Sequence, residues 1–159
     1  MVILGIDPGI ERTGYAFLNH TNSETVLIEC GCITTSKDKP ASERLLEIKK
    51  DLTHLIMKIK PDWLCIESLF FAANTKTAMV VGQARGVVLV TGVEHGLGII
   101  EITPLQVKIA ATGYGKAEKK QVQTMIQKIL KLKKVPKPDD AADACAIAWA
   151  GIGRTKLMK

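Results

Sequence analysis

The chain has 159 residues, a formal net charge of +6 and an isoelectric point near 9.2. This length suits a single domain spanning residues 1–159, and the excess of basic side chains suits a polyanionic partner such as nucleic acid. The cysteines form no CxxC pair and the histidines are scattered singly, which argues against a zinc site. Without a signal peptide or an apolar segment of membrane length, the sequence predicts a soluble, cytoplasmic protein that does not bind membranes.

The first predicted element is a strand at residues 3–9, ILGIDPG, whose apolar run ends on Asp7 before a Pro-Gly turn. An ionised carboxylate is costly to bury without a cation or hydrogen-bond donors, so Asp7 either caps this turn or binds a ligand. Two more strands are predicted at residues 13–19 and 24–35. Their short links favour pairing as hairpins.

After Pro40 the pattern changes. Apolar side chains recur every three or four residues at Leu45, Ile48, Leu52, Leu55 and Ile59, which predicts an amphipathic helix. The rest of the chain is predicted to form strands at 61–67 and 97–103 and helices at 75–95, 104–112, 117–131 and 139–150. Early strands followed by alternating helices and strands predict an α/β fold with a mixed five-stranded central sheet and helices on both faces.

Four acids stand out at the ends of these elements. Asp7 and Glu67 each end a predicted strand, so they meet at one edge of the sheet if their strands are parallel neighbours. Asp140 and Asp143 are three residues apart and share one face of the predicted helix at 139–150. Asp139 and Asp143, four apart, share a face equally well. Asp139 or Asp140 alone is more simply explained as a helix cap, whereas Asp143 lies within a run of small apolar residues.

A cluster of such acids requires divalent cations, because unneutralised carboxylates repel one another. Oxygen ligands favour Mg²⁺, with Mn²⁺ as a possible substitute. A pair of these ions per site could cleave a phosphodiester, by activating water and by stabilising the leaving oxygen.

Basic side chains are concentrated in KAEKKQ (116–121) and KILKLKKVPKPDD (128–140). These segments could be solvated helix faces or a rim that contacts phosphates, and composition alone favours the solvated faces.

Several motifs together resemble one family. They are GIDPGIERTGYA (5–16), CIESLFFAANTKTAMVVGQARGV (65–87), PLQVK (104–108), AEKKQVQ (117–123) and DAADACAIA (140–148). In this order they resemble the motifs of the RuvC family of bacterial Holliday junction resolvases, over nearly the whole chain. The resemblance implies a ribonuclease H-like fold, a homodimer, and magnesium-dependent paired nicking of four-way DNA junctions in recombination and repair. It also implies the RuvA-RuvB branch-migration complex as a partner.

The resemblance also assigns roles to individual residues. It implies that the catalytic acids and metal ligands are Asp7, Glu67, Asp140 and Asp143. Asp139 then lies outside the catalytic set. It implies that Lys108 and Lys119 lie near the scissile strand, with Lys119 taking part in catalysis. We assign Lys116 and Lys120 to DNA contact as well. It further implies that an aromatic side chain meets the bases at the junction centre, and we assign this role to Phe70 rather than to Phe71.

Three other functions were weighed against this one. Sugar kinases and actin-like ATPases also begin with a strand ending in an acid-glycine turn, but 159 residues leave no room for their second domain. A resolvase-like nuclease acting on ribosomal RNA shares the first motif, and a non-catalytic junction-binding protein would need no buried Asp143. For the homodimer we expect the helix at 75–95 to form the interface through Gly82 and Gly86; alternatively, these glycines let the helix lie close to its own sheet.

Overall fold

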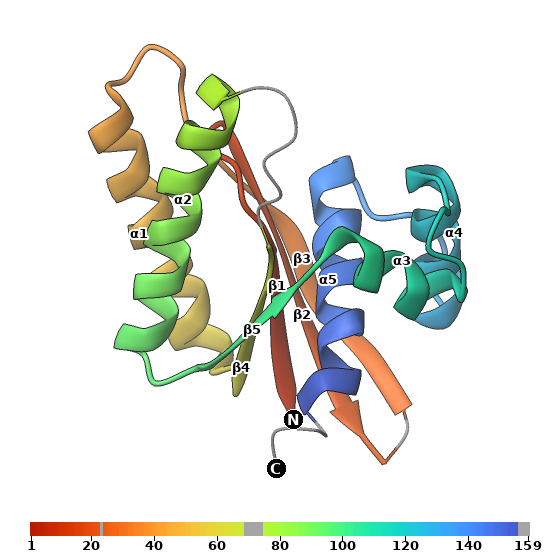
Figure 1. The fold of residues 1–159 in the computed structure, drawn as a ribbon. Coiled ribbons are helices and arrows are strands. Elements are labelled where there is room, and N and C mark those ends of the chain that lie inside the picture. The colour runs from red at the N-terminus through yellow and green to blue at the C-terminus, as the bar shows by residue number, and fades with distance from the viewer. Residues whose placement is uncertain (23, 69–74, 156–159) are drawn as a thin grey trace.

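The computed structural model describes residues 1–22, 24–68 and 75–155 (Figure 1). Its strands are β1 Val2–Asp7, β2 Arg12–Thr21, β3 Glu24–Thr34, β4 Trp63–Glu67 and β5 Gly98–Ile102. Its helices are α1 Ala41–Ile59, α2 Thr75–Glu94, α3 Pro104–Thr112, α4 Lys119–Ile129 and α5 Asp139–Thr155. No helix in the described part of the chain is long and apolar enough to cross a bilayer.

The strands form one mixed sheet in the order β3-β2-β1-β4-β5. The first three strands pair antiparallel as hairpins, and β4 and β5 join β1 as parallel neighbours. Helices α1 and α2 cover one face of this sheet, while α5 lies across the other with α3 and α4 beside it (Figure 1). The predicted α/β fold with a mixed five-stranded sheet between helices is confirmed.

Some predicted boundaries shift by a few residues. The strand predicted from 61 begins at Trp63, and the side chain of Asp62 just before it accepts a hydrogen bond from the backbone N–H of Val2 at 2.7 Å. The helix predicted from 117 begins at Lys119, because Glu118 caps it. The helix predicted to end at residue 150 continues to Thr155 through Gly151, where a side chain would overlap Cys65.

The two-residue repeat of β1 and β4 decides which way the acids point. Ile3 of β1 and Cys65 of β4 pack in the core against α5, whereas Leu4 and Ile6 pack against α1 and α2. Alternate residues of a strand point to the same face, so Asp7 and Glu67 belong to the α5 face. The alternation of side chains along β1 thus aims its terminal acid at α5.

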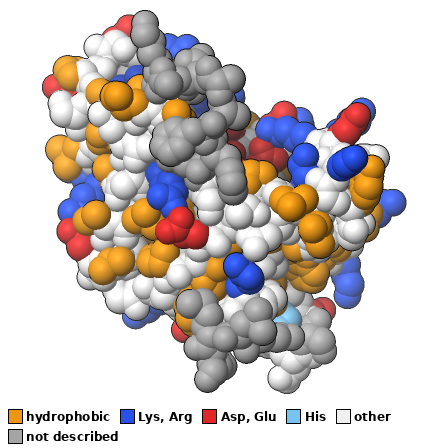
Figure 2. Space-filling model, in the orientation of Figure 1, with side chains coloured by type: hydrophobic (Ala, Val, Ile, Leu, Met, Phe, Trp, Pro, Cys, Tyr) orange, Lys and Arg blue, Asp and Glu red, His pale blue; other side chains and the backbone are white. Residues whose placement is uncertain are grey.

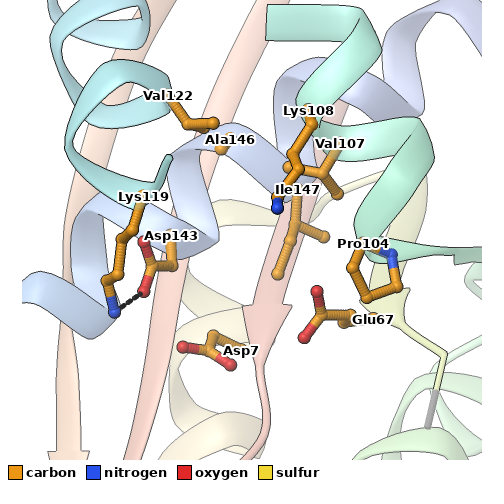
Figure 3. Close-up of a pocket in the computed structure, with 10 residues that line it drawn as sticks. All are labelled: Asp7, Glu67, Pro104, Val107, Lys108, Lys119, Val122, Asp143, Ala146 and Ile147. Carbon is orange, nitrogen blue, oxygen red and sulfur yellow. Dashed lines mark ion pairs between the residues drawn. The ribbon is translucent and has the colours of Figure 1, made fainter. Parts of the chain in front are cut away.

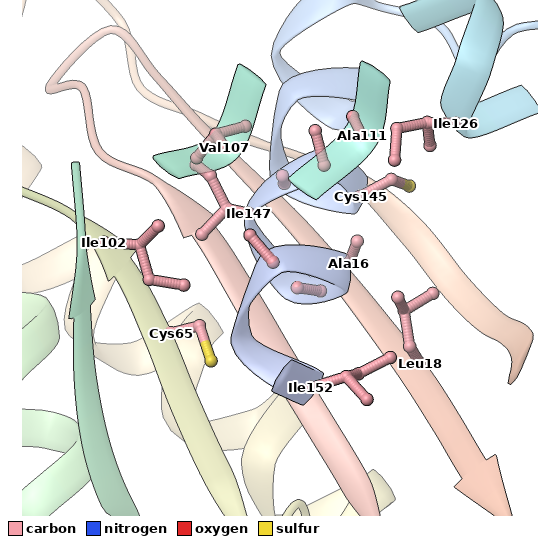
Figure 4. Packing of buried hydrophobic residues seen from close by; sticks show 14 of the residues in the cluster. Ala16, Leu18, Cys65, Ile102, Val107, Ala111, Ile126, Cys145, Ile147 and Ile152 are labelled. Carbon is pink, nitrogen blue, oxygen red and sulfur yellow. The ribbon is translucent and has the colours of Figure 1, made fainter. Parts of the chain in front are cut away.

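Small side chains let α5 lie very close to the sheet (Figure 4). Alanines line its buried side, and glycines of the sheet lie beneath it. A Cβ atom at Gly5 would overlap the backbone of Ala144, and one at Gly14 would overlap the backbone of Asp140. This close packing fixes the height of the α5 acids above the sheet edge.

Candidate active site

Asp7 and Glu67 end neighbouring parallel strands, as predicted. Ile6 pairs with Ile66 in the ladder between β1 and β4, so the acids that follow them leave the sheet side by side. Neither carboxylate has a hydrogen bond or an ion pair with any residue that the structure describes. Asp7 therefore does not cap its turn through a described contact, and its carboxylate stays open to the pocket.

Asp143 reaches the same space from α5, but its charge is already compensated. Its Oδ2 atom lies 2.5 Å from Nζ of Lys119, and its Oδ1 atom accepts a hydrogen bond of 3.1 Å from Nε2 of Gln123. Lys119 and Gln123 are four residues apart on α4, so they share one face of that helix. The side chain of Asp143 is only 23% exposed. Asp143 is therefore largely buried, as expected from the small residues around it. Its charge is compensated by Lys119 of the same chain.

These side chains surround one pocket (Figure 3). It is lined by Asp7, Glu67, Pro104, Val107, Lys108, Lys119, Val122, Asp143, Ala146 and Ile147. The carboxylates of Asp7, Glu67 and Asp143 point toward the same space, and the ammonium group of Lys108 enters from α3 on the opposite side. Thr103 and Gln106 form a capping box that fixes the start of α3, which carries Lys108.

The electrostatics of the pocket favour a bound cation. Burial, followed by the nearby charges of Asp143, Glu67 and Asp140, raises the pKa of Asp7 to about 7. Burial and Asp143 also raise the pKa of Glu67. The pKa of Lys119 is raised as well, mainly by its hydrogen bond to Asp143. The raised pKa values of Asp7 and Glu67 are typical of buried carboxylates that lie close together without enough positive charge beside them.

Asp140 lies beside this pocket rather than in its lining. Its Oδ2 atom is 3.2 Å from Nε of Arg12, yet this oxygen is buried and has no aligned hydrogen bond within the described residues. It is close enough to raise the pKa of Asp7. Asp139 is instead an exposed partner of Lys137 at 2.7 Å. Of the two neighbouring acids, Asp140 is therefore the one turned toward the sheet edge.

The carboxylate oxygens around this pocket are of the type that binds a divalent cation, although they are not yet arranged around a single point. No three acidic, histidine or cysteine side chains of the described residues already lie close enough together to hold a metal ion. The carboxylates of Asp7 and Glu67 and the buried Oδ2 of Asp140 nevertheless offer oxygens that lack hydrogen-bond donors in the described part of the chain. Figure 2 shows acidic side chains recessed in this region with basic side chains around them.

The predicted DNA-contacting residues divide into groups. Lys108 and Lys119 line the pocket, whereas Lys116 and Lys120 are exposed outside it. Lys120 lines a separate groove along α4 together with Tyr114. Phe70 and Phe71 lie outside the described residues.

Arg12 and Gln123 were missed at the level of sequence. Gln123 could have been found, because it follows Lys119 by four residues on a predicted helix. Arg12 carries no such signal, since only the packing of α5 on β2 brings it to Asp140.

Residues 3–150 match the family model described as crossover junction endodeoxyribonuclease RuvC. The chain belongs to the RuvC family. A RuvC protein from Alkaliphilus metalliredigens is 51% identical over 148 residues, which cover 93% of this chain and 90% of the relative. One from Caldicellulosiruptor saccharolyticus is 48% identical over 153 residues, covering 96% of this chain and 92% of the relative.

Solved RuvC structures share the fold over its whole length. Thermus thermophilus RuvC superimposes with a TM-score of 0.90 at 34% identity, covering 99% of this chain and 97% of that one. The same protein in complex with a Holliday junction substrate gives a TM-score of 0.93, with 99% and 96% covered. The yeast mitochondrial Holliday junction resolvase Ydc2 is 16% identical with a TM-score of 0.68, covering 93% of this chain and 76% of that one, and shows the fold alone.

Proposed function

We propose that this chain is a magnesium-dependent endonuclease that resolves four-way DNA junctions by paired symmetric nicks. The observation that carries the proposal is the pocket where Asp7 and Glu67, at the ends of parallel strands, face Asp143 and Lys119 from the helical layer. Membership of the RuvC family and the likeness to a RuvC protein bound to a Holliday junction substrate support the choice of DNA junction.

Asp7, Glu67, Asp140 and Asp143 would hold Mg²⁺ or Mn²⁺, two ions to a site. Bound there, the ions would supply an activated water and stabilise the leaving oxygen of the phosphodiester. The chain's own part is to present ionised carboxylates, and Asp7 must lose its proton before it can act as a ligand. Close packing of α5 on Gly5 and Gly14 holds two of these acids at a fixed height.

The lysines around the pocket would act on the DNA strand. Lys119 is 59% exposed while paired with Asp143, so its ammonium group can turn toward a phosphate at the mouth of the pocket. A cation at that position stabilises charge that develops on the reacting phosphate. Lys108 would meet the same strand from α3, and the exposed Lys116 and Lys120 would contact phosphates farther along it.

A homodimer would match the twofold symmetry of a four-way junction, with one active site for each of two equivalent strands. The outward face of α2 offers an interface. Met79, Gly86, Val90 and Val93 recur along it at helical spacing and are all exposed, and a Cβ at Gly86 would meet nothing within 4 Å. This open face favours Gly86 as a point of contact with a second chain over packing on its own sheet. Gly82 would lie at the same interface.

Two further parts of the proposal, the role of Phe70 and the RuvA-RuvB partner, rest on the family alone. Phe70 would stack on bases at the junction centre, and the RuvA-RuvB complex would deliver the junction. The chain would act in the cytoplasm as one domain spanning residues 1–159.

The test uses a synthetic four-way DNA junction with labelled arms. We expect paired nicks in Mg²⁺ and none when EDTA replaces it, with binding of the junction retained in both. Linear duplex DNA and a fragment of ribosomal RNA serve as comparison substrates. Preferred cutting of the RNA would support the ribosomal RNA nuclease, and binding without any metal-dependent cut would support a non-catalytic junction-binding protein.

A further inference from the structure

Of the four acids Asp7, Glu67, Asp140 and Asp143, only Asp140 does not line the candidate catalytic pocket. Its carboxylate belongs to a hollow formed by the β1–β2 turn and α2, together with Arg12, rather than to the pocket of Asp7, Glu67 and Asp143. The contact with Arg12 is one of charge at 3.2 Å without hydrogen-bond alignment, so it leaves the buried Oδ2 atom available to a better partner.

The backbone beneath Arg12 is firmly held. The hydroxyl of Thr13 donates to the carbonyl of Gly9 at 2.7 Å, and that of Thr35 donates to the carbonyl of Ile10 at 2.6 Å. The backbone N–H of Thr35 also donates to the carbonyl of Glu11 at 3.1 Å. These bonds tie the turn between β1 and β2 to the end of β3, so the start of the Arg12 side chain has a fixed position.

The backbone of Asp140, the other residue of this ion pair, is also held in place. Arg12 and Gly14 are two residues apart on β2, and both therefore face α5. A Cβ at Gly14 would overlap the carbonyl group of Asp140, so only glycine lets the first turn of α5 come this close to the strand. The ion pair thus joins two anchored backbones, and only the side chains can move.

We propose that Arg12 is a positioning residue that neutralises Asp140 and holds it beside the catalytic pocket until a divalent cation displaces it. This inference rests on the proposed metal-dependent function. Asp143 has Lys119 in the same role, so Asp140 and Asp143 are each paired with a cation from another element. Asp7 and Glu67 of the sheet have no such cation among the described residues.

Two opposite effects follow from this arrangement. In the metal-free protein, Arg12 offsets repulsion among the acids and therefore stabilises the fold. During metal binding, the same guanidinium competes for Asp140 and adds a like charge beside the incoming ion, so it weakens the affinity. Removing Arg12 should lower the stability of the metal-free protein and tighten metal binding at the same time.

The test compares Arg12→Gln with Lys37→Gln. Lys37, which follows β3, pairs with Glu11 of the β1–β2 turn at 3.2 Å, so its variant also removes one positive charge and one ion pair nearby, but none that involves Asp140. Calorimetric titration of the DNA-free protein with Mn²⁺ measures affinity, and thermal unfolding in EDTA measures stability. Arg12→Lys tests whether a positive charge at this position is enough.

For Arg12→Gln we expect metal affinity to rise about twofold to fivefold, and the melting temperature in EDTA to fall by roughly 1–3 °C. Arg12→Lys should return both values toward those of the unaltered protein, and Lys37→Gln should change neither. If the unaltered protein binds Mn²⁺ and Arg12→Gln binds it equally well or more weakly, the role of Arg12 is wrong. If the unaltered protein binds no Mn²⁺, the proposed metal-dependent function fails, and this inference with it.

Discussion

Asp7 is the residue at which folding and chemistry conflict most directly. Its strand buries apolar side chains on both faces, yet it ends in a carboxylate surrounded by three others. Burial and those neighbours favour the protonated form, whereas a metal ligand must be ionised. The folded protein therefore pays a free-energy penalty at neutral pH that a bound cation would remove.

This conflict predicts a pH-dependent effect of Asp7→Asn. The pKa of Asp7 rises from 3.8 to about 7 on folding, so the folded state holds the proton more tightly than the unfolded state. Ionisation of Asp7 thus costs little near pH 4, costs progressively more as the pH rises, and reaches its full cost above pH 7. In EDTA, Asp7→Asn should be more stable than the unaltered protein by on the order of 3 kcal/mol at pH 8.

Urea denaturation in EDTA at pH 4 and pH 8 checks this. The gain should be small at pH 4, where Asp7 is protonated in the folded state and about half protonated in the unfolded state. An equal gain at both pH values would show that the amide stabilises by packing rather than by loss of charge.

Asp143 and Asp139 provide a matched pair of acids on α5. Asp143→Asn should abolish junction cleavage while binding survives, because the amide keeps the shape and loses the charge that a cation needs. Asp139→Asn should cleave nearly normally, since Asp139 is exposed and pairs with Lys137. Cleavage and gel-shift assays on the same junction separate the two effects. The opposite pattern would shift the α5 ligand set by one residue, to include Asp139.

At the scale of elements, the packing of α5 on β1 and β2 builds the site. Alanines on the helix and glycines on the strands bring two backbones together, with Gly5 under Ala144 and Gly14 under Asp140. Helix α4 then supplies Lys119 and Gln123 to the first turns of α5. The site is therefore sensitive to the separation between layers as well as to its own residues.

Gly5→Ala tests this sensitivity. A Cβ there would overlap the backbone of α5, so the helix must move away, and we expect a loss of roughly 3 kcal/mol or more in stability. Gly153→Ala is the control, because a Cβ at Gly153 meets nothing within 4 Å, and it should be neutral or stabilise by up to about 1 kcal/mol. Denaturant midpoints compare the two variants. Similar stability for both would mean that α5 adjusts its height without difficulty.

At the scale of the whole molecule, the sheet separates two surfaces to which we assign different tasks. The pocket opens on the side of α5, while the exposed apolar face of α2 lies in the opposite helical layer (Figure 1). A dimer formed through α2 would leave both pockets accessible, so each could meet its own DNA strand.

A mixed dimer tests this division of labour. When one chain is unaltered and the other carries Asp7→Asn, each junction should receive a single nick, because each site serves one strand. Differently tagged chains allow the mixed dimer to be purified, and a denaturing gel with both strands labelled counts the cuts. Completion of both cuts by the mixed dimer would contradict the arrangement, as would paired cutting by a protein that sediments as a monomer.

The sequence by itself determined the strand-terminal acids, the order of helices and strands, and the family. Asp7 and Glu67 could be predicted as site residues because local apolar patterns mark where a strand ends. Asp143 could be predicted because it interrupts a helix of small apolar residues. The tertiary structure alone decided that Arg12 holds Asp140 and that Gln123 supports Asp143. The first contact joins elements far apart in the chain and the second joins two consecutive helices, and both depend on how α5 lies above the sheet. Local patterns do not encode that geometry, because it is set by the packing of backbone on backbone at Gly5 and Gly14.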